Sequence, residues 1–198
     1  MIQSMTAISI ASMGKTSRLH AGTLAVLALS TFLHASNAFT AQVCSANTVA
    51  MTPTSDFTVH GNGTVTHRKT GLMWKVCSEG QDWSDGSCAG TVTSEAWDAA
   101  LQIPQSLNSG GGYPSGPDYT DWRLPDLKEL KSIAELSCHS PAINETTFPS
   151  SAATLYWSSS PSASSGSDAW AVDFSTGNDN NITRSFSVLH VRLVRGGQ

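Results

Sequence analysis

Short apolar runs separated by turns dominate the first part of the chain after residue 56. Residues 57–60, 64–66 and 72–76 are rich in β-branched, aromatic and aliphatic side chains, and Gly and Asn lie between them. Such runs, bounded by residues that favour turns, predict a β-meander. Residues 77–93 are polar and are predicted to form a loop.

Two helices are predicted to follow the meander. The first begins near Ser94, and Pro104 predicts a kink or an early end near Ile103. The second begins after Pro125 and ends before Cys138, because its apolar residues recur with the spacing of one helix face. The apolar positions of the two helices are Trp97, Ala100, Leu101 and Leu107, then Leu127, Leu130, Ile133 and Ala134.

The last third returns to strand-like runs. Residues 155–159, 169–174 and 190–195 alternate with loops rich in Ser, Gly and Asn at 160–167 and 175–181. The order of strands, two helices and strands contains no alternating βαβ unit. It predicts an α+β domain with mainly antiparallel strands and long loops.

The N-terminal segment has the features of a secretory signal peptide. Lys15 and Arg18 precede an apolar run that ends at the small residues Ser36 and Ala38. This run is too short for a stable membrane span. We therefore expect a signal peptide over 1–38, a mature N-terminal segment over 39–53 and one domain over 54–198. The predicted location is the periplasm, the cell surface or the exterior, with no membrane span after cleavage.

Charge is scarce and slightly acidic. Charged residues make up 13% of the chain, whose net charge is −4, and cleavage would leave nine basic and fifteen acidic residues, or −6. Nucleic acid is not expected as a partner, since phosphate contacts require a basic patch. A coiled coil is also excluded, because no heptad pattern exists.

All four cysteines follow the predicted cleavage site, and an even number in an exported chain favours two disulfides. Three pairings are possible on sequence alone. Loop closure favours Cys77 with Cys88, which leaves Cys44 with Cys138. No CxxC pair is present, so a zinc site is not expected. The histidines His60, His67 and His139 are interpreted as surface residues in turns.

Several short motifs follow one another in the order of a known family. They are Gly61-Asn62-Gly63-Thr64-Val65-Thr66, Thr70-Gly71-Leu72-Met73-Trp74, Tyr119-Thr120-Asp121-Trp122-Arg123-Leu124-Pro125, Lys128-Glu129-Leu130, Pro141-Ala142-Ile143, Tyr156-Trp157-Ser158-Ser159 and Val191-Arg192-Leu193-Val194-Arg195-Gly196-Gly197. Together they resemble the family named after the C-terminal domain of the Legionella collagen-like protein (Lcl), over about 54–198. The resemblance implies a C-type-lectin-like fold in which loops form a ligand platform, and an exported adhesin as the family's namesake.

The resulting functional hypothesis is an exported adhesin-like or receptor-like module that binds a surface glycan or protein. The net charge argues against the sulfated polysaccharides bound by the namesake. Contacts are expected from loops 160–167 and 175–187, with Trp170 and Phe186 as possible anchors. The candidate ligand-binding residues are Trp170, Asp173, Asn178, Asp179, Asn180, Asn181, Arg184, Phe186 and His190. The oligomeric state stays open.

A second group of residues is interpreted as structural. In it, tryptophans fill the core and arginines hold carbonyls or carboxylates. Its members are Trp74, Asp121, Trp122, Arg123, Pro125, Glu129, Trp157, Arg192 and Arg195. For the Asp121–Arg123 segment, binding of a polar ligand is the alternative interpretation.

Catalysis, cofactors and metals are not expected. Ser158, His190 and Asp173 could be combined into a triad, but no GxSxG motif supports it. The calcium-site triplets of C-type lectins are also absent, and turn chemistry explains the segment from Ser175 to Asp179 that follows Asp173. The alternatives are an enzyme on a scaffold like that of formylglycine-generating enzymes, which uses a reactive cysteine pair, and a structural envelope protein without a specific ligand.

Overall fold

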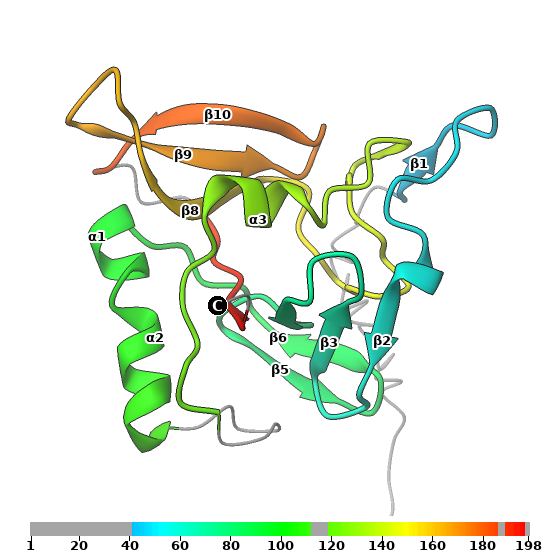
Figure 1. Cartoon of the computed structure of the whole chain (residues 1–198), viewed down its shortest axis with the longest axis horizontal. Coiled ribbons are helices and arrows are strands. Elements are labelled where there is room, and N and C mark those ends of the chain that lie inside the picture. The colour runs from blue at the N-terminus through cyan, green and yellow to red at the C-terminus, as the bar shows by residue number, and fades with distance from the viewer. Residues whose placement is uncertain (1–40, 112–118, 186–188, 197–198) are drawn as a thin grey trace, which may run out of the picture. The chain divides into compact units, whose positions relative to one another are not determined.

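The computed structural model describes residues 41–111, 119–185 and 189–196. The predicted signal peptide and Phe186 lie outside these residues, so both remain sequence-based predictions. The described chain is mostly antiparallel β-structure with short helices (Figure 1). The α+β prediction is therefore confirmed. None of the described helices has the length and apolar character needed to cross a membrane.

The predicted meander is present in a four-stranded sheet. A short 3₁₀ turn at Thr54–Asp56 leads into β2 (Phe57–Val59), β3 (Thr64–His67) and β4 (Met73–Lys75). The last strand, β11 (Val194–Arg195), pairs with β4 and completes the order β11-β4-β3-β2. The two ends of the domain are thus held together by one sheet.

Residues 77–93 are not the loop that the sequence predicted. They contain a hairpin of β5 (Gln81–Ser84) and β6 (Ser87–Gly90), whose turn is formed by Asp85 and Gly86 with φ of 48° and 87°. Positive φ at both turn positions matches the right-handed twist of two paired strands. The prediction failed because few side chains of this hairpin are buried, so its strands lack apolar alternation.

Both disulfide predictions are confirmed. Cys77 is bonded to Cys88 in β6, which ties the hairpin to the segment after β4. Cys44 is bonded to Cys138 and joins β1 (Val43–Cys44) to β7 (Cys138–His139). The second bridge closes a loop with a sequence separation of 94 residues and fixes the N-terminal segment to the domain.

The helical region is shorter and more broken than predicted. The first predicted helix consists of α1 (Trp97–Ala100), α2 (Ile103–Ser106) and a π-helical turn η2 (Leu107–Gly111). The interruption occurs before Ile103, and Pro104 lies in the first turn of α2, where its missing N–H costs nothing. The main helix, α3 (Leu127–Lys131), ends three residues before Ala134, which forms a β-bridge with Ile143.

The C-terminal strands form a second sheet with the order β10-β9-β8. Its members are β8 (Leu155–Pro161), β9 (Asp168–Asp173) and β10 (Asn178–Thr183). The sequence predicted a loop over 175–181, but residues 178–183 are a strand. That strand is exposed at the sheet edge and contains one apolar residue, Ile182, so the alternation that identifies a half-buried strand is missing.

Buried side chains form two groups. One surrounds Trp74 and Tyr156, and the other surrounds Trp97, Trp122 and Trp157. Trp74 and Trp157 are 0% exposed, as expected for core residues. His67 was predicted at the surface but is buried in β3, where its ring stacks on Phe57 with centroids 4.9 Å apart. Burial lowers the pKa of His67, against a smaller opposing effect of Asp56.

Candidate ligand-binding face

Most of the candidate residues lie on the hairpin of β9 and β10, and its closed end is held by backbone contacts. Asp173 accepts hydrogen bonds from the backbone N–H of Ser175 at its carboxylate (2.8 Å) and from that of Gly177 at its carbonyl (2.6 Å). Gly177 has a φ of 82°, a left-handed conformation that favours glycine. Asp173, the last residue of β9, therefore holds the turn through its carboxylate and its carbonyl.

The open end of the hairpin is held by Arg184. Its backbone N–H donates to the carbonyl of Ser167 (2.9 Å), and its Nε donates to the carbonyl of Asp168 (3.1 Å). Its guanidinium carbon lies 4.3 Å from the ring centre of Trp97, within the range of cation–π attraction. Arg184 thus connects the hairpin to α1.

The strand register divides the candidate residues between two faces. Trp170 pairs with Asn181, and Val172 pairs with Asp179. Cross-strand partners point to the same side of a sheet and successive residues to opposite sides. We call the side that carries Asp168, Trp170, Val172, Asp179, Asn181 and Thr183 the Trp170 face, on which Val172 is buried.

Three candidates point to the other side. Asp173 pairs with Asn178, and Asn180 pairs with the buried Ala171. The candidate residues of the hairpin therefore do not form one cluster. Asn178 and Asn181 are both exposed asparagines of one strand, but their side chains leave it in opposite directions.

Trp170 differs from every other tryptophan of the chain. Of the six tryptophans, the other five belong to or pack against one of the two buried groups, whereas Trp170 is half-buried and belongs to neither. Its carbonyl accepts a hydrogen bond from the Ser158 hydroxyl (2.7 Å), which fixes its backbone toward β8. A partly exposed indole on a fixed strand is suited to contact a ligand.

Asp179 is already engaged by the neighbouring helix. Lys131 of α3 donates to its carboxylate and forms an ion pair with it. The hydrogen bond from Lys131 lowers the pKa of Asp179. Among the described residues, no group of three His, Cys, Asp or Glu side chains is arranged to hold a metal ion.

His190 lies away from the Trp170 face. Its Nδ1 lies 2.9 Å from the Thr93 carbonyl and 3.0 Å from the Ser94 hydroxyl, and its ring packs edge-on against Tyr156. Burial lowers the pKa of His190, although the bond to Thr93 opposes this effect. These contacts differ from those of a Ser158–His190–Asp173 triad, since Ser158 binds the Trp170 carbonyl and Asp173 binds its own turn.

Four of the residues interpreted as structural form two ion-paired junctions. Arg123 donates two hydrogen bonds of 2.6 Å to Glu129, and Glu129 forms a capping box with Asp126 at the start of α3. The hydrogen bond from Arg123 lowers the pKa of Glu129. Arg195 binds both carboxylate oxygens of Asp121 at 2.6 and 3.2 Å. Trp122, between Asp121 and Arg123 in the sequence, is 2% exposed and belongs to the second buried group.

Arg192 is buried beneath the four-stranded sheet. Its guanidinium donates to the carbonyls of Lys75 (3.0 Å) and Val76 and to the hydroxyls of Ser78 and Ser151. A buried ion pair, Lys75 with Glu79 at 2.5 Å, lies on the same segment and was not identified from the sequence. Its two members are only four residues apart, which could have been a signal.

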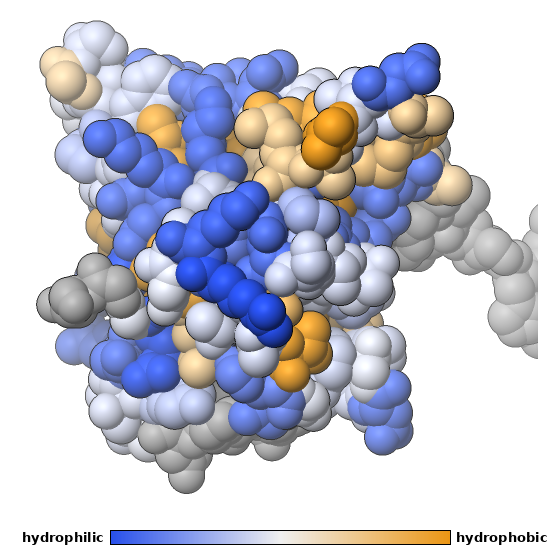
Figure 2. All heavy atoms as spheres, turned by 45° about the vertical axis from the view of Figure 1, so that its right-hand side comes forward, coloured by the Kyte–Doolittle hydropathy of each residue, from blue (hydrophilic) through white to orange (hydrophobic). Residues whose placement is uncertain are grey.

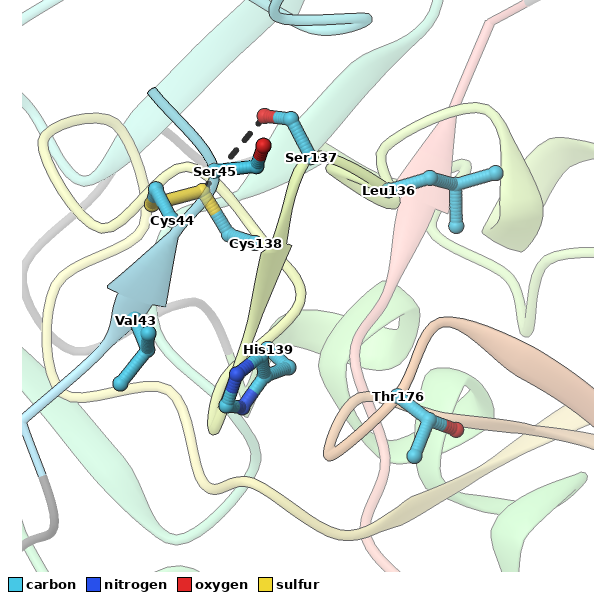
Figure 3. A pocket seen from close by; sticks show the side chains of 8 residues that line it. All are labelled: Val43, Cys44, Ser45, Leu136, Ser137, Cys138, His139 and Thr176. Atoms are coloured by element: carbon cyan, nitrogen blue, oxygen red, sulfur yellow. Dashed lines mark hydrogen bonds between the residues drawn. A yellow bond between two sulfur atoms is a disulfide. The ribbon is translucent and has the colours of Figure 1, made fainter. Parts of the chain in front are cut away.

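A depression of about 540 Å³ lies beside the Cys44–Cys138 disulfide (Figure 3). Val43 and Leu136 line it and are 52% and 49% exposed. His139 and Thr176 also line it, and neither was identified from the sequence as a lining residue. In Figure 2 the largest hydrophobic area lies at the upper right of an otherwise mostly hydrophilic face.

Comparison with known proteins identifies one related family. A family model described as the Lcl C-terminal domain matches residues 63–195. No curated protein matches the chain significantly. The family match covers most of the described chain, including β3, β4 and β11 of the four-stranded sheet and the whole three-stranded sheet that carries the Trp170 face.

Proposed function

The chain belongs to the Lcl C-terminal domain family, and from this premise we propose that it is an exported module that binds a surface ligand through the Trp170 face. The observation that carries this proposal is the position of Trp170. It is the one tryptophan that neither belongs to a buried group nor packs against one, and its cross-strand partner is an exposed asparagine.

The chemistry of the face suits a neutral glycan. An indole offers a flat apolar surface to a sugar ring, while amide, hydroxyl and carboxylate groups beside it can bind sugar hydroxyls. The Trp170 face carries Asp168 and Asp179, and Lys131 neutralises the second of these. Asp168 forms no ion pair among the described residues, so its negative charge disfavours a sulfated glycan and the proposed ligand is an uncharged oligosaccharide.

Export is supported by the cysteine chemistry. All four cysteines are bonded in two disulfides, and such bonds persist in oxidising compartments. Together with the N-terminal sequence features, this supports delivery to the periplasm, the cell surface or the exterior.

The proposal is tested with printed neutral and sulfated oligosaccharides and three variants. We expect the parent chain to bind neutral probes, Trp170→Ala to abolish this binding and Asn181→Ala to weaken it roughly tenfold, the effect of losing one or two hydrogen bonds. Asn178→Ala is the matched control, because it removes an exposed asparagine of the same strand from the opposite face.

Two results would contradict the proposal. One is binding of neutral probes that Trp170→Ala leaves unchanged while the variant stays folded. The other is equal weakening by Asn178→Ala and Asn181→Ala, which would show that the side-chain face does not matter. Capture of a protein partner with no glycan binding would replace the glycan with a protein ligand.

A further inference from the structure

β10 is an edge strand with an exposed outer side. Within the described chain it pairs with β9 alone, and four of its residues, Asn178, Asp179, Asn181 and Thr183, are exposed. An edge strand carries backbone N–H and C=O groups that can pair with another strand. Pairing with a further strand requires backbone groups of β10 that point away from β9.

The hydrogen-bond pattern between β9 and β10 fixes the direction of these groups. The backbone N–H of Arg184 donates to Ser167, in the same register that pairs Thr183 with Asp168. Because residues of an antiparallel pair alternate between bonded and non-bonded positions, Ile182, Asn180 and Asn178 also point to β9. Asp179, Asn181 and Thr183 therefore point their N–H and C=O groups to the outer edge. The carbonyl of Trp170, the partner of Asn181, points to β8, in agreement with this assignment.

The edge lacks the usual protection against strand pairing. Natural edge strands are guarded by lysines, prolines, bulges or inward-pointing charges. β10 contains no lysine and no proline, and its unbroken register with β9 shows no bulge. Its one charged residue, Asp179, forms an ion pair with Lys131. Among the described residues no second strand pairs with the outer edge, and the one charge of the strand is compensated.

We propose that β10 pairs antiparallel with β10 of a second copy of this chain, centred on Asn181. In this register Asn181 faces the partner's Asn181, and Asp179 faces the partner's Thr183. All three outward residues then form bonded pairs, about six backbone hydrogen bonds in total. The two sheets become one continuous sheet across the two-fold axis.

Self-complementarity favours a second copy over an unrelated strand. The pairing places no like charges opposite each other, since each Asp179 meets a threonine, and Asn181 meets an amide that can both donate and accept. An isologous contact of this kind closes on itself and forms a dimer rather than a fibre. The inference is independent of the proposed function, because strand pairing uses the edge of β10 and ligand binding uses its face.

A charge-exchange experiment at Asn181 tests the pairing. The dissociation constant of the dimer is measured by sedimentation equilibrium on the full, oxidised chain. In Asn181→Lys and in Asn181→Glu, like charges would face each other across the axis, so each variant alone is expected to dimerise roughly tenfold more weakly or worse. An equimolar mixture is expected to restore a heterodimer. A parent chain that is monomeric at the highest concentration reached would overturn the proposal, as would a mixture no tighter than the separate variants.

A second pair of variants separates backbone from side-chain effects. Asn181→Pro removes the outward N–H, and proline is tolerated at strand edges where the N–H does not bond within the sheet. Loss of both symmetric hydrogen bonds at Asn181 is expected to weaken the dimer roughly tenfold or more. Asn181→Ala retains the backbone N–H and is expected to dimerise within about twofold of the parent, although it weakens glycan binding. Equal dimerisation of the proline variant and the alanine variant would overturn the proposal.

Discussion

Replacing Glu135 with glutamine should strongly destabilise the domain, because this buried carboxylate holds two segments that are far apart in sequence. It is 4% exposed and accepts five hydrogen bonds, from the N–H groups of Met51, Thr52 and Ser137 and the hydroxyls of Thr52 and Ser137, at 2.6 to 3.1 Å. A glutamine would keep one acceptor oxygen and place an NH₂ donor against backbone donors. Glu135→Gln would therefore lose hydrogen bonds and leave some of the buried N–H and O–H donors around residue 135 without an acceptor.

The magnitude follows from the pKa of Glu135. Burial raises this pKa, but the bonds from Ser137, Met51 and Thr52 outweigh burial and lower it from 4.5 to about 2. A lowering of that size corresponds to roughly 3 kcal/mol in favour of the charged folded form. We expect Glu135→Gln to lower the free energy of unfolding by about 2–4 kcal/mol near neutral pH.

The pH dependence has a defined sign. Because the folded pKa lies below the unfolded value, the contribution is complete above pH 4.5 and is lost as the pH falls toward 2. Urea unfolding of the parent and of Glu135→Gln should therefore give a difference that shrinks between these two values. Glu145→Gln is the control, since burial raises the pKa of Glu145 and its removal should cost nothing. A loss of unfolding free energy below about 0.5 kcal/mol for Glu135→Gln, or a loss that does not change with pH, would show that the Glu135 carboxylate does not hold these two segments together.

Three further predictions concern the frame that supports the Trp170 face. Gly80→Ala should lower the free energy of unfolding by about 3 kcal/mol or prevent folding, because its Cβ would lie 2.4 Å from the Thr91 carbonyl oxygen. Gly71→Ala has open space around it and should lower the free energy of unfolding by only about 1 kcal/mol. Equal urea midpoints of the two variants would contradict this prediction. Replacing Cys44 and Cys138 by serine should lower the free energy of unfolding by about 4–5 kcal/mol, and replacing Cys77 and Cys88 by about 3 kcal/mol. The difference arises because the two disulfides close loops with sequence separations of 94 and 11 residues. A lower melting temperature for the Cys77 and Cys88 variant than for the Cys44 and Cys138 variant would contradict this prediction. Arg123→Lys should cost about 1 kcal/mol, since lysine cannot reproduce the two-pronged contact with Glu129, and unchanged stability in urea would show that the junction is not stabilising.

The sequence was most informative where strands have one buried side. The meander over 57–76 and strands β8 and β9 have buried aromatic and aliphatic residues, and these were predicted. The hairpin over 81–90 and β10 were not, because both are largely exposed and their polar residues have no reason to alternate with apolar ones. Backbone pairing, which leaves little trace in composition, forms these strands.

The arrangement of the candidate site also depends on strand pairing, which the composition of the sequence does not show. Trp170 and the asparagines of β10 were identified from residue type, but the sequence placed the asparagines in a loop rather than on the strand that pairs with Trp170. Only the register with β9 separates Asn181 from Asn178 and Asn180. Glu135 was not identified at all, since its partners Met51 and Thr52 precede it by more than 80 residues and are brought together by the fold.

The most direct test of the proposed ligand-binding face is the indole N–H signal of Trp170 in a ¹⁵N–¹H spectrum, recorded while a neutral oligosaccharide selected on the array is added. Trp170→Phe assigns the signal. We predict that the Trp170 signal shifts with the ligand while those of the buried Trp74 and Trp157 stay in place. Binding of the oligosaccharide with no change in the Trp170 signal would contradict the account.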